Sequence, residues 1–347
     1  LILKRNRETM KAAVLVKNAE AHNSFEIREV DQPKAAAGQV LIKVEAFGLN
    51  FADIMARQGN YQDCPPLPAV IGYDVVGEVV EIGAGVDNVI LGDRVTAMTR
   101  FGGYAEYALT DFRACAKIAK DYPVGKATAL TTQYCTAYYC FKEIMNLYEG
   151  DKVLIHAAAG GVGTALVQLA KHAGCEIFGT AGSDEKLAYL KELGVDHPIN
   201  YRAQDFEVEV RKIVGDQGLD AVFDPIGGKS VKKGLKLLGS GGRIVLFGAS
   251  DMTGANIFGK IGTGLGFGFY HPVEFMLTSK GMMGVNMLRI ADDRPMVLKR
   301  CLENVVKLIA EGVLNPTEAK VFSIDEIGEA HAFLEGRQSI GKVSVSW

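Results

Sequence analysis

The sequence has few of the features that mark a metalloprotein or a membrane protein. Its six cysteines are scattered, without a CxxC pair or a cysteine and histidine at metal-ligand spacing, and its six histidines form no cluster. No apolar run reaches the ~18 residues of a transmembrane helix, and no signal peptide is visible. We therefore expect a soluble, cytoplasmic protein with reduced thiols and no bound metal.

The sequence also lacks a strong excess of charge of either sign. Its 38 basic and 41 acidic residues give a formal net charge of −3, which offers no electrostatic attraction for nucleic acid or for an acidic membrane. At 347 residues the chain is too long for one ordinary hydrophobic core. These properties predict a globular protein of two domains without a nucleic-acid partner.

The first third of the chain is rich in short β-strand patterns. A short helix is expected over 50–57 with Asn50 as its N-cap, and a loop containing Tyr61 follows at 58–68. Proline and glycine separate the apolar runs, which is typical of a small barrel-like domain. The expected strands cover residues 11–16, 24–30, 40–47, 73–82 and 94–96.

The periodicity changes near residue 123, where helical spacing begins and runs over 124–145. Strands and helices then alternate, which predicts βαβ units, a doubly wound parallel sheet and a ligand at the carboxyl ends of its strands. The expected strands are 153–156, 176–180, a short one near residue 199, 219–223, 243–247 and 281–287. The expected helices are 185–193, 206–214, 229–238 and 295–311, before a closing strand, helix and strand at 320–323, 327–334 and 341–346.

The segment KVLIHAAAGGVG at 152–163 is a short apolar strand followed by a turn of small residues and the start of a helix. This layout places backbone N–H groups and a positive helix end against a pyrophosphate. Ala158 stands where the common GxGxxG fingerprint has its first glycine, so a tight turn that needs small residues only for packing is the alternative. The candidate phosphate-binding residues are Ala159, Gly160, Gly161, Val162 and Gly163.

The end of the next strand indicates which dinucleotide is bound. NAD-selective sites usually place an acidic side chain there, whereas this chain offers a hydroxyl, an ammonium group and a phenol from Ser183, Lys186 and Tyr201. These groups suit a 2′-phosphate and favour NADPH. Asp184 and Glu185 could instead bond ribose hydroxyls, or they could serve only to complement the positive end of a helix.

The joint order of several motifs resembles the medium-chain dehydrogenase/reductase superfamily, in its zinc-independent quinone oxidoreductase (zeta-crystallin-like) branch. The motifs are GLNFADIMARQGNY at 48–61, GYDVVGEVVEIGAGV at 72–86, GDRV at 92–95, GGYAEY at 102–107, AAAGGVG at 157–163 and GKV at 341–343. HPINYRAQDF at 197–206, DPIGG at 224–228 and the long segment after Gly248 look most like the vesicle amine transport protein group. The resemblance implies a GroES-like β-rich catalytic domain over 1–125, completed by 289–347, and a Rossmann NADPH-binding domain over 126–288.

The resemblance also bears on metal binding. Zinc-dependent relatives carry a cysteine in the segment that here reads GLNFAD, and a Gly-His-Glu motif where this chain has Gly72, Tyr73 and Asp74. In the segment where those relatives carry the cysteine, this chain has Asn50 and Phe51. A zinc site built from thiolate and imidazole is therefore not expected.

The resemblance further implies which residues surround the nicotinamide, in a cleft between the two domains. Reduction of a quinone or an activated C=C bond needs mainly a positioned hydride donor and the exclusion of water, and water can supply the proton. Asn50, Tyr61 and Tyr73 are the candidate catalytic residues, with Tyr61 the best donor to a carbonyl oxygen because a phenol donates without ionising. The implied neighbours of the nicotinamide are Asn50, Tyr61, Thr136, Phe247, Gly248, Asn286 and Lys342.

Some of these residues also have purely structural explanations. Asn50 could only cap its helix, Tyr61 could only shield a loop, and Thr136 could only pack within a helix. The glycine-rich, aromatic segment 251–280 could be a lid, a subunit contact, a surface that meets a membrane, or an insertion packed on its own domain.

Three functions remain open at this point. The first is an NADPH-dependent reductase of quinones or α,β-unsaturated carbonyls, and the second is an enoyl thioester reductase. The third is a binding or membrane-associated protein that holds NADPH with little catalysis. Relatives commonly form dimers through edge strands of the cofactor domain, so the resemblance also implies a homodimer in which 281–287 is such a strand.

Overall fold

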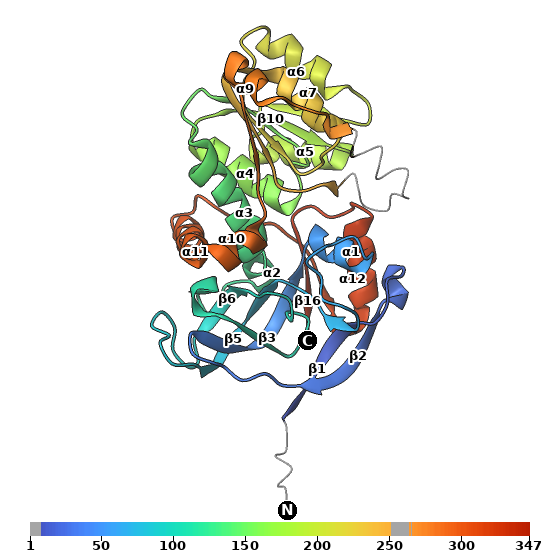
Figure 1. The fold of residues 1–347 in the computed structure, drawn as a ribbon, viewed down its shortest axis with the longest axis vertical. Coiled ribbons are helices and arrows are strands. Elements are labelled where there is room, and N and C mark those ends of the chain that lie inside the picture. The colour runs from blue at the N-terminus through green and yellow to red at the C-terminus, as the bar shows by residue number, and fades with distance from the viewer. Residues whose placement is uncertain (1–7, 251–263, 265) are drawn as a thin grey trace, which may run out of the picture. The chain divides into compact units, whose positions relative to one another are not determined.

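The computed structural model describes residues 8–250, 264 and 266–347, and the chain divides into two compact units (Figure 1). Unit 1 comprises Leu1–Thr132, Leu288–Val306 and Glu318–Trp347. Unit 2 comprises Gln133–Met287 and Lys307–Thr317. Among the described residues no helix is long and apolar enough to cross a membrane.

Unit 1 is built mainly of β-strands with a few short helices. Its strands are β1 (Thr9–Leu15), β2 (Phe25–Asp31), β3 (Gln39–Leu49), β4 (Ala69–Val70), β5 (Asp74–Ile82), β6 (Arg94–Met98), β7 (Tyr107–Asp111), β8 (Cys115–Lys117), β15 (Glu318–Ser323) and β16 (Lys342–Ser346). Its helices are η1 (Ala21–Asn23), α1 (Phe51–Arg57), η2 (Phe112–Ala114), α2 (Val124–Ala127), η6 (Ile324–Glu326) and α12 (Ile327–Glu335). Two further helices, α10 (Met287–Asp293) and α11 (Pro295–Ala310), lie mainly in the same unit.

Strand β3 is the centre of the larger sheet in the described part of unit 1. The strand order is β15-β16-β3-β5-β6-β8, with β7 also paired to β3, and a smaller sheet has the order β2-β1-β4. Because β16 pairs with β3 in antiparallel register, with Val343 opposite Leu49, the last strand of the chain lies beside the strand that leads into α1. The core of the unit consists of the apolar side chains that these strands turn inward, among them Phe47, Val75 and Val345.

Unit 2 alternates strands and helices, as the periodicity predicts. Its strands are β9 (Lys152–Ile155), β10 (Glu176–Ala181), β11 (His197–Asn200), β12 (Leu219–Asp224), β13 (Leu238–Leu246) and β14 (Gly281–Gly284). Its helices are α3 (Cys135–Tyr138), η4 (Tyr139–Met145), α4 (Gly161–His172), α5 (Asp184–Leu193), α6 (Phe206–Val214), α7 (Lys229–Leu237) and α9 (Pro272–Thr278). The turn η3 (Leu130–Tyr134) crosses the boundary between the two units.

The strands of unit 2 form a parallel sheet with the order β11-β10-β9-β12-β13-β14 in the described residues. Helices α4 and α5 pack together, and so do α6 and α7, which lie on the opposite side of the sheet (Figure 1). The strand order reverses between β9 and β12, and at such a point the loops that follow the strands diverge and leave room for a ligand. The predicted α/β class with a doubly wound parallel sheet is confirmed.

The segment with helical spacing over 124–145 consists of several short helical elements. The structure has α2, the π-helical turn η3, the short helix α3 and the π-helical η4 in its place. Helical spacing alone does not reveal such interruptions, because the inserted residues leave most apolar side chains on the inner face. The structure therefore confirms the helical character of the segment and adds the π-helical turns, which the spacing did not predict.

The segment 251–280 is described only toward its end, since residues 251–263 and 265 lie outside the described residues. In the described part, Phe267, Tyr270 and Phe275 pack against the core of unit 2. A methyl group on Gly227 would approach Phe267 Cζ to 2.6 Å, so the ring lies directly on that turn. The described end of the segment therefore packs on its own unit, which is one of the four alternatives for the whole.

Candidate functional site

The turn between β9 and α4 reverses the chain sharply at the carboxyl end of the central strand. Ala157 adopts a left-handed conformation with φ of +50°, and its carbonyl accepts a hydrogen bond of 2.9 Å from the amide of Gly160. Ala158, which replaces the expected first glycine, does not have a positive φ. Because its backbone lies in a region open to any residue, alanine is tolerated there. The departure from the GxGxxG pattern thus has a local structural reason.

The small residues of this turn are required by close contacts. A Cβ on Gly163 would lie 2.3 Å from the carbonyl oxygen of Ala157, and one on Gly161 would lie 1.8 Å from Gln133 Oε1. Gly160 is the N-cap of α4 and contributes no side-chain hydrogen bond. The first amides of α4 therefore lack both intrahelical and N-cap side-chain acceptors and point, with the positive end of the helix, toward the turn.

These features fit the pyrophosphate of a dinucleotide. A phosphate needs donors and a positive potential without a side chain in the way, and the turn provides both. Ala159 is buried beneath the turn, and Val162 is half-buried in the first turn of α4. Contact between these residues and a cofactor stays a prediction.

The end of β10 brings together the three residues that the sequence assigns to the 2′-phosphate. Ser183 is the N-cap of α5, and its hydroxyl accepts from the amide of Lys186 at 3.4 Å. The amide of Tyr201 donates to the carbonyl of Ala181 at 3.1 Å. A methyl group on Gly182 would lie 2.5 Å from the Tyr201 hydroxyl. The hydroxyl, ammonium and phenol residues therefore surround one short turn.

The acidic neighbour of this cluster already has a hydrogen-bond partner. Asp184 Oδ1 accepts from Asn200 Nδ2 at 3.3 Å, and both Asp184 and Glu185 are exposed in the first turn of α5. That position accounts for their charge as a complement to the helix end. Sequence reasoning overlooked Arg202, an exposed basic residue whose amide donates to Asn200 Oδ1 at 3.1 Å, next to Tyr201. Its position next to Tyr201, a predicted 2′-phosphate residue, could have indicated it from the sequence.

The neighbouring loop at the same edge is organised by Asp224, the last residue of β12. Its Oδ1 accepts from the amides of Ile226 and Gly227 at 2.6 and 3.0 Å, and its Oδ2 accepts from the Ser230 hydroxyl at 2.5 Å. These bonds close the DPIGG turn. The amide of Phe247 donates to the Asp224 carbonyl at 3.1 Å, so this predicted residue lies beside that turn.

The other predicted residues of unit 2 lie on different elements. Gly248 is exposed just after β13, and Asn286 is exposed just after β14, where the amide of Val285 donates to the Leu246 carbonyl at 2.8 Å. Gly248 and Asn286 therefore follow adjacent strands of the sheet. Thr136 is 7% exposed on α3. Their contacts with a cofactor remain predictions.

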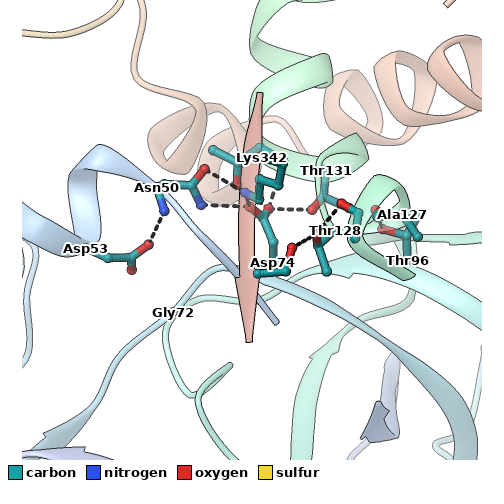
Figure 2. Close-up of polar contacts among 12 residues, drawn as sticks. Asn50, Asp53, Gly72, Asp74, Thr96, Ala127, Thr128, Thr131 and Lys342 are labelled. Atoms are coloured by element: carbon teal, nitrogen blue, oxygen red, sulfur yellow. Dashed lines mark hydrogen bonds and ion pairs between the residues drawn. The ribbon is translucent and has the colours of Figure 1, made fainter. Parts of the chain in front are cut away.

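A buried ion pair lies at the centre of a polar network in unit 1 (Figure 2). Asp74 Oδ2 accepts from Lys342 Nζ at 2.5 Å and from Asn50 Nδ2 at 2.7 Å. Asp74 Oδ1 accepts from the Thr131 hydroxyl at 2.5 Å and from the amide and hydroxyl of Thr132 at 2.9 and 2.5 Å. Asp74 and Lys342 are both 0% exposed, so the carboxylate has its lost hydration replaced by five donors.

This network determines the orientation of two predicted site residues. Lys342 Nζ donates to Asn50 Oδ1 at 3.0 Å, so the amide of Asn50 is held at both ends within the network. Asn50 precedes α1 as predicted, but the carboxylate that bonds the helix start is that of Asp53, which accepts from the Asn50 amide at 2.7 Å. Sequence reasoning did not include Asp74 among the site residues. Asp74 could have been noticed in the sequence as an acidic residue within a predicted apolar strand.

The same network bears on metal binding. No group of three or more histidine, cysteine, aspartate or glutamate side chains arranged to hold a metal ion is found among the described residues. Asp74 stands at the third position of the motif that supplies zinc ligands in zinc-dependent relatives. Because the Lys342 ammonium lies against its carboxylate, a second cation there would be repelled.

A second buried polar group lies close to the start of α1. Asp53 is 0% exposed, and its Oδ1 has no hydrogen-bond donor among the described residues. Burial raises the pKa of Asp53 to about 7. The Tyr104 hydroxyl lies 3.2 Å from His331 Nε2, and burial lowers the pKa of His331 to about 3. This histidine is therefore neutral at physiological pH, and the Asp53 carboxyl titrates near neutrality.

We expect the variant D53N to gain stability relative to the wild type as pH rises from 5 to 8. Between the ordinary pKa of 3.8 and about 7, native Asp53 holds a proton that the unfolded chain releases. The wild type therefore loses stability over this range, and the amide, which cannot ionise, does not. Calorimetric unfolding midpoints at pH 5, 6, 7 and 8 measure the difference. A constant difference between the two proteins across that range would contradict the prediction.

Two tyrosines predicted to act in catalysis lie together in unit 1. The rings of Tyr61 and Tyr73 meet edge to face with centroids 6.3 Å apart. Burial raises the pKa of both phenols, so both are neutral donors. Tyr73 is 4% exposed and its hydroxyl has no partner among the described residues, whereas Tyr61 is partly exposed. Tyr61 is therefore the more accessible of the two.

Comparison with known proteins places these features in a family. The model of the alcohol dehydrogenase GroES-like domain matches residues 36–120, and that of the zinc-binding dehydrogenase matches 161–302. The synaptic vesicle membrane protein VAT-1 homolog of Rattus norvegicus is 34% identical over 315 residues, covering 90% of this chain and 77% of the relative. The 2-haloacrylate reductase of a Burkholderia species is 32% identical over 340 residues, with 96% and 97% coverage. The quinone oxidoreductase-like protein 2 of Bos taurus is 31% identical over 329 residues, with 94% and 90% coverage.

Solved structures show the same architecture over nearly the whole chain. The human VAT-1 homolog-like protein has a TM-score of 0.83 at 28% identity, covering 98% of both chains. A mycobacterial protein complexed with NADPH has a TM-score of 0.82 at 28% identity, covering 97% of this chain and 100% of the other. The CurK enoyl reductase has a TM-score of 0.83 at 26% identity, with 97% and 99% coverage. With a GroES-like domain, a Rossmann domain and these relatives, the chain belongs to the medium-chain dehydrogenase/reductase superfamily, in the zinc-independent quinone oxidoreductase-like branch near the VAT-1 homologs.

Proposed function

We propose that this protein is a zinc-independent, NADPH-dependent oxidoreductase that transfers a hydride to a quinone or an α,β-unsaturated carbonyl. The observation that carries the proposal is the edge of the unit 2 sheet, where the turn before α4 offers backbone donors. The next strand end gathers Ser183, Lys186 and Tyr201 around Gly182. The first feature suits a pyrophosphate and the second suits a 2′-phosphate.

The comparisons support the coarse part of this proposal. A structure of this fold at 28% identity is described as complexed with NADPH, and two relatives above 30% identity are named as a quinone oxidoreductase-like protein and a 2-haloacrylate reductase. We extend these properties to this chain because its own residues fit the cofactor. Gly160–Gly163 would hold the pyrophosphate, and Lys186 with its neighbours would hold the 2′-phosphate. NADPH, when bound, supplies the hydride.

The proposed mechanism names no obligatory catalytic acid among the described residues of unit 1 and does not need one. In the proposal Tyr61 donates a hydrogen bond to the carbonyl oxygen of the substrate, which withdraws electron density from the carbon that accepts the hydride. Its raised pKa keeps the phenol protonated, so the donor is available at physiological pH. Tyr73 supports the ring of Tyr61 from the side. Water supplies the proton that completes the reduction.

The proposal is tested by NADPH consumption with 1,4-benzoquinone, 9,10-phenanthrenequinone, an enone and crotonyl-CoA. We expect turnover of at least one quinone or enone, and a fall in kcat of more than about tenfold in Y61F, because loss of one preorganised donor costs roughly that much or more. Y107F, a change on β7 in a tyrosine that the proposal does not use, is the matched control. Unchanged turnover by Y61F would show that the Tyr61 hydroxyl does not donate to the substrate.

Enoyl thioesters form the second substrate class to test. The CurK structure is described as an enoyl reductase, and it matches 97% of this chain. Activity with crotonyl-CoA alone in the panel would assign this chain to that class.

A different function is favoured by one surface of unit 2. Phe269, Met276 and Leu277 are 91%, 76% and 79% exposed on and next to α9, which is unusual for large apolar side chains. This surface suits a membrane-associated protein, and several relatives are named as synaptic vesicle membrane proteins. NADPH binding without turnover in the panel would support this alternative.

The quaternary structure and location belong to the same proposal. Among the described strands β14 is the last of the unit 2 sheet, and Met283 on it is 49% exposed. An unpaired strand edge next to apolar side chains suits a homodimer formed edge to edge. We propose such a homodimer in the cytoplasm, acting on a small-molecule substrate.

A further inference from the structure

We infer that Gln133 is a pyrophosphate-binding residue whose side-chain amide donates to a phosphoryl oxygen of the dinucleotide. This inference rests on the proposed function, because it requires that the chain bind NADPH. It assigns a role to a residue that no sequence motif marked. The residue stands in the π-helical turn η3, and such turns are frequent at functional sites.

The first observation is the position of the amide. A Cβ built on Gly161 would lie 1.8 Å from Gln133 Oε1 and 2.6 Å from Nε2. The tip of the side chain therefore fills the space beside the first residue of α4. The twelve-residue helix α4 points its unbonded N-terminal amides toward the same turn. Any anion held by those amides lies within reach of the Gln133 amide.

The second observation is an unsatisfied polar atom. Gln133 is 8% exposed, and among the described residues no donor is bonded to its Oε1. A buried polar atom without a partner is destabilising, so a polar side chain at this packed position calls for an explanation. An apolar side chain of the same length would avoid this cost. A polar group kept here is explained by a ligand that uses it.

The chemistry of a carboxamide explains how the same side chain serves the turn and the ligand. The amide has an acceptor oxygen and a donor nitrogen that exchange places by a half-turn of the terminal torsion. The oxygen is favoured against the positive end of a helix alone. The NH₂ group is favoured when an anion lies there, because a donor to a charged oxygen forms a stronger hydrogen bond than a neutral pair.

Gln133 is also uncharged, which distinguishes it from the cations that bind the other phosphate. Lys186 stands in the first turn of α5, which follows β10, and Arg202 follows Tyr201, whose amide bonds the last residue of β10; a 2′-phosphate would sit at this strand end. A neutral donor at the pyrophosphate serves NADPH and NADH equally. Gln133 thus contributes to affinity for any dinucleotide, without selecting between them.

The test uses the full chain, the variants Q133M and Q133E, and calorimetric titration with NADPH and with adenosine 2′-phosphate, which has no pyrophosphate. We expect Q133M to bind NADPH about tenfold to a hundredfold more weakly, because it keeps the length of the side chain and loses the donor. Q133E should bind it more weakly still, since a carboxylate repels a phosphate. Both variants should bind adenosine 2′-phosphate within about twofold of the wild type.

Two controls separate a binding role from a structural one. The variant Q217M changes an exposed glutamine before β12, and it should leave NADPH affinity unchanged. The unfolding midpoint of Q133M without ligand should equal or exceed that of the wild type, because the substitution removes an unpaired buried acceptor. NADPH affinity of Q133M equal to or above that of the wild type would overturn the inference. Equal weakening for both ligands would also overturn it, since it would indicate a distorted unit 2.

The outcome for the wild type separates this inference from the proposed function. A wild-type chain that binds neither NADPH nor NADH refutes the proposed function and the inference together. A wild-type chain that binds NADPH, with Q133M and Q133E unchanged, refutes only the role of Gln133.

Discussion

Replacing Lys342 by methionine is expected to destabilise the protein by about 3–5 kcal/mol, because it leaves a buried carboxylate without its cation. Asp74 and Lys342 are both fully buried, and Nζ lies 2.5 Å from Oδ2. If the 347 residues unfold together, a loss of this size should lower the unfolding midpoint by roughly 4–7 °C. Calorimetry of K342M against the wild type at pH 7 measures it.

The double variant D74N/K342M tests the physical cause. Asparagine removes the buried charge and keeps an acceptor for the Thr131 and Thr132 hydroxyls, so most of the lost stability should return. K43M changes an exposed lysine on β3 and should change the free energy of unfolding by no more than about 0.5 kcal/mol. A K342M midpoint close to that of K43M would show that the buried pair contributes little.

Replacing Lys186 by alanine is expected to weaken NADPH binding about tenfold to a hundredfold and to leave NADH binding nearly unchanged. A charge-assisted hydrogen bond to the 2′-phosphate contributes about 1.5–3 kcal/mol, and NADH has no such phosphate. Dissociation constants for both cofactors, measured by fluorescence titration, give the ratio directly. The same ratio should appear in KM values if the enzyme turns over.

The matched control is K191A, which removes an exposed lysine from the last turn of the same helix. It should leave the preference between NADPH and NADH as it is in the wild type. Equal losses of affinity for both cofactors in K186A would mean that Lys186 does not select the 2′-phosphate. The choice would then fall to Tyr201 or Arg202, which lie at the same turn.

Local sequence patterns predicted the elements of unit 2 closely, because each pattern has its own period. The predicted helix over 206–214 is α6, and the predicted helix over 185–193 begins one residue late relative to α5. The parallel sheet follows from the alternation of such elements. Helical spacing over 124–145 did not predict the π-helical turns η3 and η4. Thr131 and Thr132 are adjacent residues that both bond Asp74 Oδ1, and a regular helix would turn them to different faces.

The candidate site also has a part that local sequence predicted and a part that it missed. The sharp turn between β9 and α4 could be predicted, since strand, small residues and helix are contiguous and their geometry is local. Ser183 and Lys186 are also close in sequence, and the structure joins them by one hydrogen bond. Gln133 and Arg202 were missed, because neither stands in a pattern that requires a polar side chain.

The sequence alone was sufficient for the family, the two kinds of domain and the strand, turn and helix of 152–172. Each of these depends on the order of motifs and on the periodicity of short segments. Only the tertiary structure brought Asn50, Asp74 and Lys342 into one network, since 292 residues separate the first from the last. It likewise placed Gln133 beside Gly161. Such contacts depend on which buried groups meet when distant strands pair, and a polar residue in an apolar strand does not by itself identify its partner.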